Sequence, residues 1–425
     1  MLTLKDLRGS TADVATVLPR AEQDVSATVD TVKPILEQVR TGGVEAVLDL
    51  SEKFDGVRPP SLRVPQEKLN EALDQLDPSI REALEELISR AREVHTAQLP
   101  AASVISPGPD SRITNRWVPV RRVGLYVPGG QAVYPSSVVM NVVPAQVAGV
   151  ESLAITSPPQ AEFGGYPHPV VLAAAALLGI DEVYAAGGAQ AVGMLAYGAE
   201  DDQGERICAP VSLITGPGNI FVVTAKRAVQ GVVGIDSEAG PTEIMVLADE
   251  TADAGLVAAD LISQAEHDEL AAAVLVTDSM GLAESVLEQV AGQAEYTEHA
   301  ARVRASLSGD QSAVLVVDSL DVAVEVANAY GAEHLELMTA EDAELVDRIH
   351  NAGAVFVGSY TPVSLGDYCA GSNHVLPTGG ASAYSSGLNV TSFMRSQQVI
   401  HYGRDGLNQV CLLYTSDAAD DSLRV

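Results

Sequence analysis

The sequence predicts an α/β protein with two modules, each a parallel sheet covered by helices. Short apolar runs alternate with longer segments whose apolar residues recur at three- and four-residue spacing. This alternation occurs in two separate series, as expected when helices connect parallel strands. The length of 425 residues also exceeds what one hydrophobic core usually holds.

The first hundred residues precede both series and are predicted to be helical. The segment 1–25 is interpreted as a helical N-terminal segment, and apolar residues recur at helical spacing over 32–39, 44–50 and 69–94. We expect these helices to pack on the second module, which makes that module discontinuous in the sequence.

The first series begins with the apolar run Val123–Val127, a glycine-rich turn and a predicted helix over 136–150. Further strand and helix pairs are predicted at 153–156 with 170–178, 182–185 with 189–197, and 211–214 with 221–230.

The second series starts near Glu243. Its predicted strands are 244–247, 273–276, 313–317 and 354–357, and its predicted helices are 254–266, 282–290 and 322–330. Both series therefore predict Rossmann-like modules, with boundaries near Tyr126 and Glu243.

The composition argues against several classes of partner. A net charge of -32 disfavours binding to nucleic acid or anionic membranes, because both need clustered Lys and Arg. No apolar run is long enough to span a membrane, and no signal peptide is visible. Three cysteines at unrelated spacings fit a reducing compartment. We expect a cytoplasmic protein that acts on a small molecule.

Three turns of the first module are rich in glycine: 128–130, 187–190 and 216–219. Each follows a strand and opens a helix, whose N-terminus offers backbone donors to phosphate. A dinucleotide is one interpretation. Because no G-x-G-x-x-G fingerprint occurs, each turn taken singly is better explained by chain reversal, which needs glycine for steric reasons alone.

Two regions of the second module combine metal-binding side chains. Gln264 and His267 lie three residues apart at the end of a predicted helix, and Asp367 and His374 lie in a glycine-rich loop. Amide, imidazole and carboxylate ligands together suit Zn²⁺ with an open coordination position. Taken alone, the helical pair is more often a surface or capping feature.

Glu333 and His334 follow a helix predicted to end near Tyr330, so we expect them at a helix C-terminus beside the second sheet. His is the commonest general base and Glu can activate water. An isolated pair of this kind is more often an exposed Glu and a capping His.

Seven motifs occur in one order that resembles the histidinol dehydrogenase family over roughly residues 20 to 410. They are GLYVPGG at 124–130, GGAQA at 187–191, TGPGN at 215–219, AGPTE at 239–243, SQAEH at 263–267, AEHL at 332–335, and GDY at 366–368 with NHVLP at 373–377. The resemblance implies oxidation of L-histidinol through L-histidinal to L-histidine, with NAD and one Zn²⁺ per subunit, in a homodimer.

The resemblance also implies roles for individual residues. Gln264, His267 and Asp367 would bind zinc, His334 would be the general base, and Glu333 would activate the water that hydrates the aldehyde. Tyr126, Gln190 and Asn219 would contact NAD. The residues that would contact substrate are Thr242, Gln264, His267, His334, Asp367 and His374.

The predicted division of the chain follows from these roles. Residues 126–243 form the NAD-binding module, and residues 26–125 with 244–388 form the module for substrate and zinc. Residues 389–425 form a C-terminal segment that contacts the second subunit.

The end of the chain departs from the family. The family closes with segments that carry a Glu and a His, whereas the last histidine here is His401 and no Glu or His follows Val410. We interpret the sequence after Val410 as truncated or frame-shifted, a hypothesis that independently obtained DNA would test.

Three alternatives follow from the sequence. One is a related zinc and NAD dehydrogenase acting on another small alcohol or diol. The second is a zinc-poor binding protein without turnover. The third, an aldehyde dehydrogenase with Cys369 as nucleophile, is set aside because no basic residue is adjacent to lower the thiol pKa.

Overall fold

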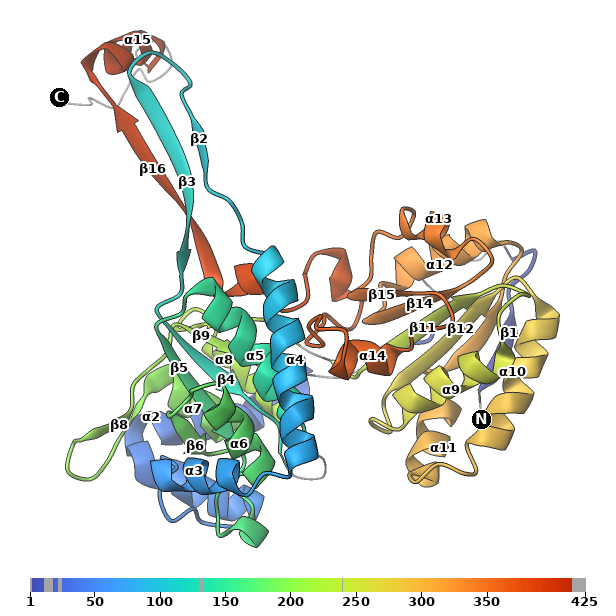
Figure 1. Ribbon diagram of the computed structural model, residues 1–425, viewed down its shortest axis with the longest axis horizontal. Coiled ribbons are helices and arrows are strands. Elements are labelled where there is room, and N and C mark those ends of the chain that lie inside the picture. Colours follow the sequence, from blue (N-terminus) through green and yellow to red (C-terminus); the bar gives the residue numbers. More distant parts are fainter. Residues whose placement is uncertain (1, 11–17, 22–24, 130–132, 239, 415–425) are drawn as a thin grey trace.

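The computed structural model describes residues 2–10, 18–21, 25–129, 133–238 and 240–414. Gly130 and Ala239 of the motifs and residues 415–425 of the tail therefore lie outside the described residues. Figure 1 shows two α/β modules beside each other and a narrow arm that rises from one of them. The strands of both modules pair in parallel, which confirms the predicted α/β class.

The first module contains a five-stranded sheet whose order is β10-β9-β4-β5-β6. The strands are β4 (Arg122–Tyr126), β5 (Ser152–Ser157), β6 (Val183–Ala185), β9 (Leu213–Thr215) and β10 (Gly234–Ile235). The helices between them are α5 (Pro135–Ala148), α6 (Pro169–Leu177), α7 (Gly188–Tyr197) and α8 (Ile220–Val229). Apart from β10, which was not predicted, these bounds agree with the predicted elements to within about two residues, because each buried strand is a short apolar run between turn residues.

The N-terminal helices pack on the first module, so their predicted place on the second module is wrong. These helices are α2 (Val25–Asp55), α3 (Gln66–Asp74) and α4 (Pro78–Ala97). Helix α2 packs on α7 and α8, α3 packs on α6, and α4 packs on α5. Val32, Leu36 and Val39 of α2 join the same core as Leu195 of α7. Helical periodicity reports that one face is buried, but not which surface buries it.

Helix α2 also joins two helices that the sequence predicts as separate. It bends at Gly43, whose φ is +56°. A Cβ at this position would lie 2.3 Å from the carbonyl oxygen of Glu200, so both the backbone conformation and the close approach require glycine.

The second module contains a six-stranded sheet with the order β1-β13-β12-β11-β14-β15. Its strands are β1 (Thr3–Asp6), β11 (Glu243–Ala248), β12 (Ala272–Thr277), β13 (Ala313–Val316), β14 (His334–Met338) and β15 (Ala354–Val357). One face packs on α9 (Ala254–Ala265), α10 (Met280–Gln293) and α11 (Ala300–Ser308), and the other on α12 (Leu320–Tyr330) and α13 (Asp342–Val346). Of these elements, β1, β14, α11 and α13 were not predicted from the sequence.

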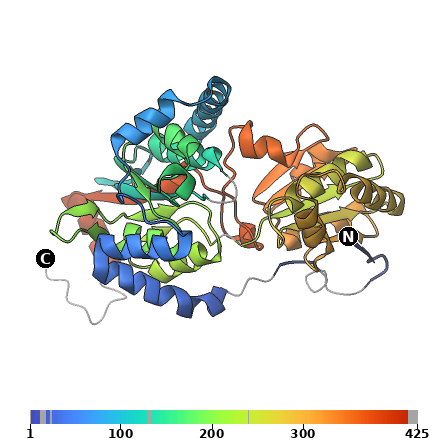
Figure 2. The ribbon, with the colours of Figure 1, turned by 90° about the horizontal axis from the view of Figure 1, so that it is seen from below.

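Strand β1 corrects the predicted helical N-terminus. Residues Thr3–Asp6 pair in parallel with Ala313–Val316 and form an edge strand of the second sheet. The second module is therefore discontinuous in the sequence because it includes this N-terminal strand. Figure 2 shows the chain starting in this module and crossing to α2 in the other.

The arm is a three-stranded antiparallel sheet with the order β16-β3-β2. It consists of β2 (Ser103–Ile105), β3 (Ser111–Pro119) and β16 (Met394–Tyr402), and α15 (Arg404–Tyr414) follows at its tip (Figure 1). Most side chains of β16 are exposed. Among the described residues, no helix is long and apolar enough to cross a membrane.

Shorter elements complete the chain. They are β7 (Ala199–Glu200) with β8 (Arg206–Cys208), the 3-10 helices η1 (Ala161–Phe163), η2 (Ala381–Ala383) and η3 (Val390–Phe393), and α14 (Val363–Tyr368).

Candidate active site

The polar residues singled out in the second module gather at the amino ends of its central strands. Thr242 precedes β11, Glu333 precedes β14, and Gln264 is in the last turn of α9. Gln264 Nε2 donates to Thr242 Oγ1 at 2.6 Å, and Thr242 Oγ1 donates to Glu333 Oε2, also at 2.6 Å. This chain of hydrogen bonds leaves the amide oxygen of Gln264 available to a metal ion.

Glu333 and His334 are buried, which corrects their expected position at a helix C-terminus. Helix α12 ends at Tyr330, and His334 is the first residue of β14, paired in register with Ile244 and Ala354. Glu333 is 7% and His334 is 5% exposed, so an exposed Glu with a capping His is excluded. The backbone amide of Glu243 also donates to Glu333 Oε2 at 3.0 Å.

The ring of His334 is oriented by a hydrogen bond to the backbone. Its Nδ1 lies 3.2 Å from the carbonyl oxygen of Glu243, and a carbonyl can only accept. Nδ1 therefore carries the proton, and Nε2 presents its lone pair. Nε2 is buried and has no hydrogen-bond partner among the described residues.

Asp367 and His374 lie close to each other, but Asp367 belongs to a short helix and not to the loop that the sequence predicted. Asp367 belongs to α14, and Nδ1 of His374 donates to its backbone carbonyl at 3.1 Å. Burial lowers the pKa of His374, the charge of Asp367 opposes this, and the imidazoles of His334 and His267 lower the pKa further. These electrostatic interactions place the four side chains in one region.

Tyr134 joins this region from the first module, and the sequence analysis missed it. Its ring stacks on the ring of His267, with the two ring centroids 6.3 Å apart. Burial raises the pKa of Tyr134, and the charge of Asp367 adds to this shift. Asn373 attaches the same loop to the first module by donating to the carbonyl of Met140 at 2.7 Å. In the sequence, Tyr134 is an aromatic residue in a turn between a strand and a helix. Nothing in that position indicates a contact with the second module.

The donor set fits a zinc ion. In the described part of the chain, no three His, Cys, Asp or Glu side chains form a cluster able to hold a metal. The predicted set contains only two such residues, His267 and Asp367, with Gln264 as a third ligand of another type. Oxygen and imidazole donors of this mixed kind suit zinc at a site that leaves room for substrate.

The three residues predicted to contact NAD lie in the first module and already have partners. The Tyr126 hydroxyl accepts from Gly188 N at 3.1 Å, and burial raises its pKa to about 12. Gln190 Nε2 donates to Asp55 at 3.3 Å, and Asn219 accepts from the first amides of α8. Tyr126 and Gln190 are buried.

The strand order places two of the glycine-rich turns at a topological switch point. The chain runs from β4 outward to β5 and β6, then returns to β9 on the other side of β4. Ligands of open α/β sheets bind where the strand order reverses, at the carboxyl ends of the strands. The turn at 216–219 follows β9, and it is held by Gly216 N donating to Asp236 and by Lys226 donating to Gly216 O.

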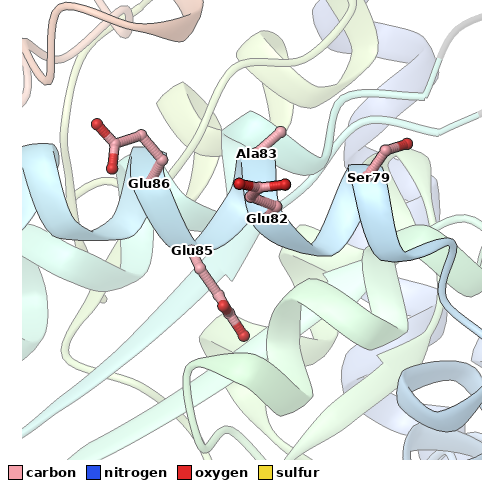
Figure 3. A pocket seen from close by; sticks show the side chains of 5 residues that line it. All are labelled: Ser79, Glu82, Ala83, Glu85 and Glu86. Atoms are coloured by element: carbon pink, nitrogen blue, oxygen red, sulfur yellow. The ribbon is translucent and has the colours of Figure 1, made fainter.

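A hollow of about 610 Å³ lies elsewhere, along α4. Ser79, Glu82, Ala83, Glu85 and Glu86 line it, all from one helix (Figure 3). None of the predicted site residues lines it. The acidic face of a single helix lacks the converging groups of a catalytic site. The candidate active site is therefore placed at the polar residues described above and not at this hollow.

Comparison with known proteins gives one consistent result. The model of a family described as histidinol dehydrogenase matches residues 18–423, which extends past Val410, where the sequence analysis placed the end of the family-like sequence. A histidinol dehydrogenase from Thermobifida fusca is 59% identical over 405 residues, covering 95% of this chain and 91% of the relative.

Two further relatives agree. A histidinol dehydrogenase from Mycolicibacterium smegmatis is 57% identical over 95% of this chain and 92% of its own length. The crystal structure of histidinol dehydrogenase from Elizabethkingia anophelis is similar with a TM-score of 0.92 and 29% identity, covering 98% of this chain and 94% of that one.

Proposed function

This chain belongs to the histidinol dehydrogenase family, and from this premise we propose that it oxidises L-histidinol through L-histidinal to L-histidine with NAD and one zinc ion per subunit. It is an oxidoreductase of histidine biosynthesis. The single observation that carries the chemical proposal is the orientation of His334. A buried imidazole whose Nδ1 donates to a backbone carbonyl, and whose Nε2 has no partner within the described part of the chain, is arranged to accept a proton.

Zinc is proposed to bind Gln264, His267 and Asp367. When bound, it would supply a Lewis acid that holds and orients the substrate's nitrogen atoms. His374 and Thr242 are the proposed substrate contacts. Thr242 is positioned for this by bridging Gln264 and Glu333, so a change at Thr242 would also disturb the groups on either side.

The protein residues have two proposed tasks. His334 Nε2 accepts the proton of the carbinol hydroxyl as the alcohol is oxidised. Glu333 accepts a proton from the water that adds to the aldehyde carbon, which gives the hydrate that is oxidised next. The hydrogen bonds from Thr242 and Glu243 hold the Glu333 carboxylate in place for this second task.

NAD is proposed to bind the Rossmann-like first module and to supply the hydride acceptor. The switch point beside β4 and the glycine-rich turns support this assignment. Tyr126, Gln190 and Asn219 stand around these turns. Their present hydrogen bonds would keep the turns in position while the backbone amides contact the cofactor.

The proposal is tested by NADH formation from L-histidinol. We expect two NADH per L-histidinol, and loss of activity after chelation that zinc restores. A panel of small alcohols and diols serves as the comparison. Turnover of another alcohol without turnover of L-histidinol would replace the proposed substrate, and full activity in metal-free protein would remove zinc from the proposal.

We also propose that the chain forms a homodimer through its arm. Ile105, Ile113 and Ile400 pair in register across the three strands, so their side chains form one row on one face. Ile105 is 56% and Ile400 is 64% exposed. Exposed apolar rows on a protruding sheet are typical of interaction surfaces.

Charge on this row should weaken the dimer. We expect the double change Ile105→Asp and Ile400→Asp to shift the protein toward monomer in sedimentation experiments. Tyr296→Asp, at a side chain that is 90% exposed and outside the arm, is the control. A monomeric parent protein, or a dimer unaffected by the double change, would contradict this interface.

A further inference from the structure

Two buried carboxyl groups lie next to the proposed active site and have no part in the chemistry described above. Glu336 of β14 is 0% exposed and Asp260 of α9 is 8% exposed. Neither oxygen of Glu336 receives a hydrogen bond from a backbone amide or a fixed side-chain donor among the described residues. Buried ionised groups without partners are costly, so this pair requires an explanation.

Among the described residues, the strand neighbours of Glu336 are apolar, and Asp260 is the titratable group that acts on it. Val246 of β11 and Phe356 of β15 flank Glu336 in register, and both belong to the core between the sheet and α9. Burial, the charge of Asp260 and a hydrogen bond with it together raise the pKa of Glu336 to about 9. Burial also raises the pKa of Asp260.

The pair connects the two elements that carry the site. Glu336 and His334 are two residues apart on β14, so they project from the same face of the strand. Asp260 and Gln264 are four residues apart on α9, one helical turn from each other. A hydrogen bond between Asp260 and Glu336 would therefore link α9 to β14 beside Gln264 and His334.

We propose that Glu336 and Asp260 share one proton, and that this carboxylic acid–carboxylate hydrogen bond is a positioning contact that holds Gln264 relative to His334. The role for Gln264 and His334 rests on the proposed function, whereas the shared proton does not. Removing the proton would leave two adjacent carboxylates in an apolar layer, which repel each other and separate α9 from β14.

Stability gives a test that needs neither metal nor turnover. Glu336 has a raised pKa in the folded state, so its protonation stabilises the fold fully below its unfolded pKa, and this contribution is lost as pH rises toward about 9. The unfolding temperature of the metal-free protein should therefore fall between about pH 5 and pH 9. Glu336→Gln, which keeps a donor but cannot titrate, should show a smaller fall.

Asp260→Asn tests the same pair from the helix, because an amide there can donate to an ionised Glu336. We expect this variant also to show a smaller fall. Glu325→Gln, on the exposed face of α12, is the control and should follow the parent protein. Identical pH profiles for the parent, Glu336→Gln and Asp260→Asn would overturn the shared proton.

Zinc content and activity test the positioning role. Glu336→Gln should keep zinc and L-histidinol oxidation at neutral pH and extend activity to higher pH than the parent. Glu336→Leu should lose at least about tenfold in kcat and retain less zinc after dialysis, because nothing then fastens α9 to β14. If Glu336→Leu folds and keeps full zinc and activity, the positioning role is wrong. If the parent does not oxidise L-histidinol, the proposed function fails while the unfolding experiment still decides the shared proton.

Discussion

Replacing His334 with Asn should reduce L-histidinol oxidation by a factor of about 10² to 10⁴, the usual contribution of a positioned general base. The imidazole is 5% exposed, its Nδ1 donates to the Glu243 carbonyl, and its Nε2 has no hydrogen-bond partner in the ranges that the structure describes. An Asn side chain can occupy this buried position, but its amide is no base. The loss should appear in kcat as well as in kcat/KM, measured by NADH formation.

His350→Asn is the matched control for this experiment. His350 lies in the same module but is exposed, and only its backbone amide is held, by Asn328. We expect this variant to keep the activity of the parent. NAD binding and the unfolding temperature should be unchanged in both variants. If His334→Asn retains activity within a factor of a few, His334 is not the base.

Replacing Glu333 with Gln should slow the oxidation of L-histidinal far more than that of L-histidinol. Only the aldehyde step needs an activated water, and we expect a loss of about 10² or more there. The Gln side chain has the same length and can still accept from Thr242 and Glu243 through its oxygen. Glu333→Gln therefore removes the basicity of the side chain while keeping its position.

The two half-reactions are measured separately, with L-histidinol and with L-histidinal as starting compounds in single-turnover experiments. Thr242→Ser is the control, because a serine hydroxyl can form the same bridge between Gln264 and Glu333. We expect it to leave the ratio of the two rates unchanged. Equal losses in both half-reactions of Glu333→Gln would contradict the division of tasks between Glu333 and His334.

Strand β14 shows why part of the second sheet escaped the sequence analysis. It begins with His334, Leu335 and Glu336, and an imidazole and a carboxyl group are buried where a central strand normally carries apolar residues. Functional sites are where the structure expected from the local sequence most often differs from the structure that the fold imposes. Strands β11, β12 and β13 of the same sheet are buried throughout and are apolar apart from Glu243 and Thr277 at their ends, and they were predicted close to their observed bounds.

The sequence named the residues of the candidate site, but it did not indicate how they are connected. The motif order indicated Gln264, His267, Glu333 and His334 by family resemblance, and the hydrogen bonds now connect Gln264 to Glu333 through Thr242. The site lies at the amino ends of β11 and β14, whereas the glycine-rich turns of the first module lie at carboxyl ends. The stacking of Tyr134 on His267 could not be predicted, because the two residues belong to different modules.

The sequence by itself determined the alternation of strands and helices, the parallel sheets and the residue types available for chemistry, because each of these is recorded in local apolar spacing or in side-chain identity. Only the tertiary structure decided that α2, α3 and α4 cover the first module and that β1 joins the second sheet. It also decided that His334 is buried, with its Nε2 unpaired among the described residues, and that Glu336 and Asp260 are buried near enough to interact. Periodicity shows that a side chain is buried, while the identity of what buries it depends on contacts between segments far apart in the chain.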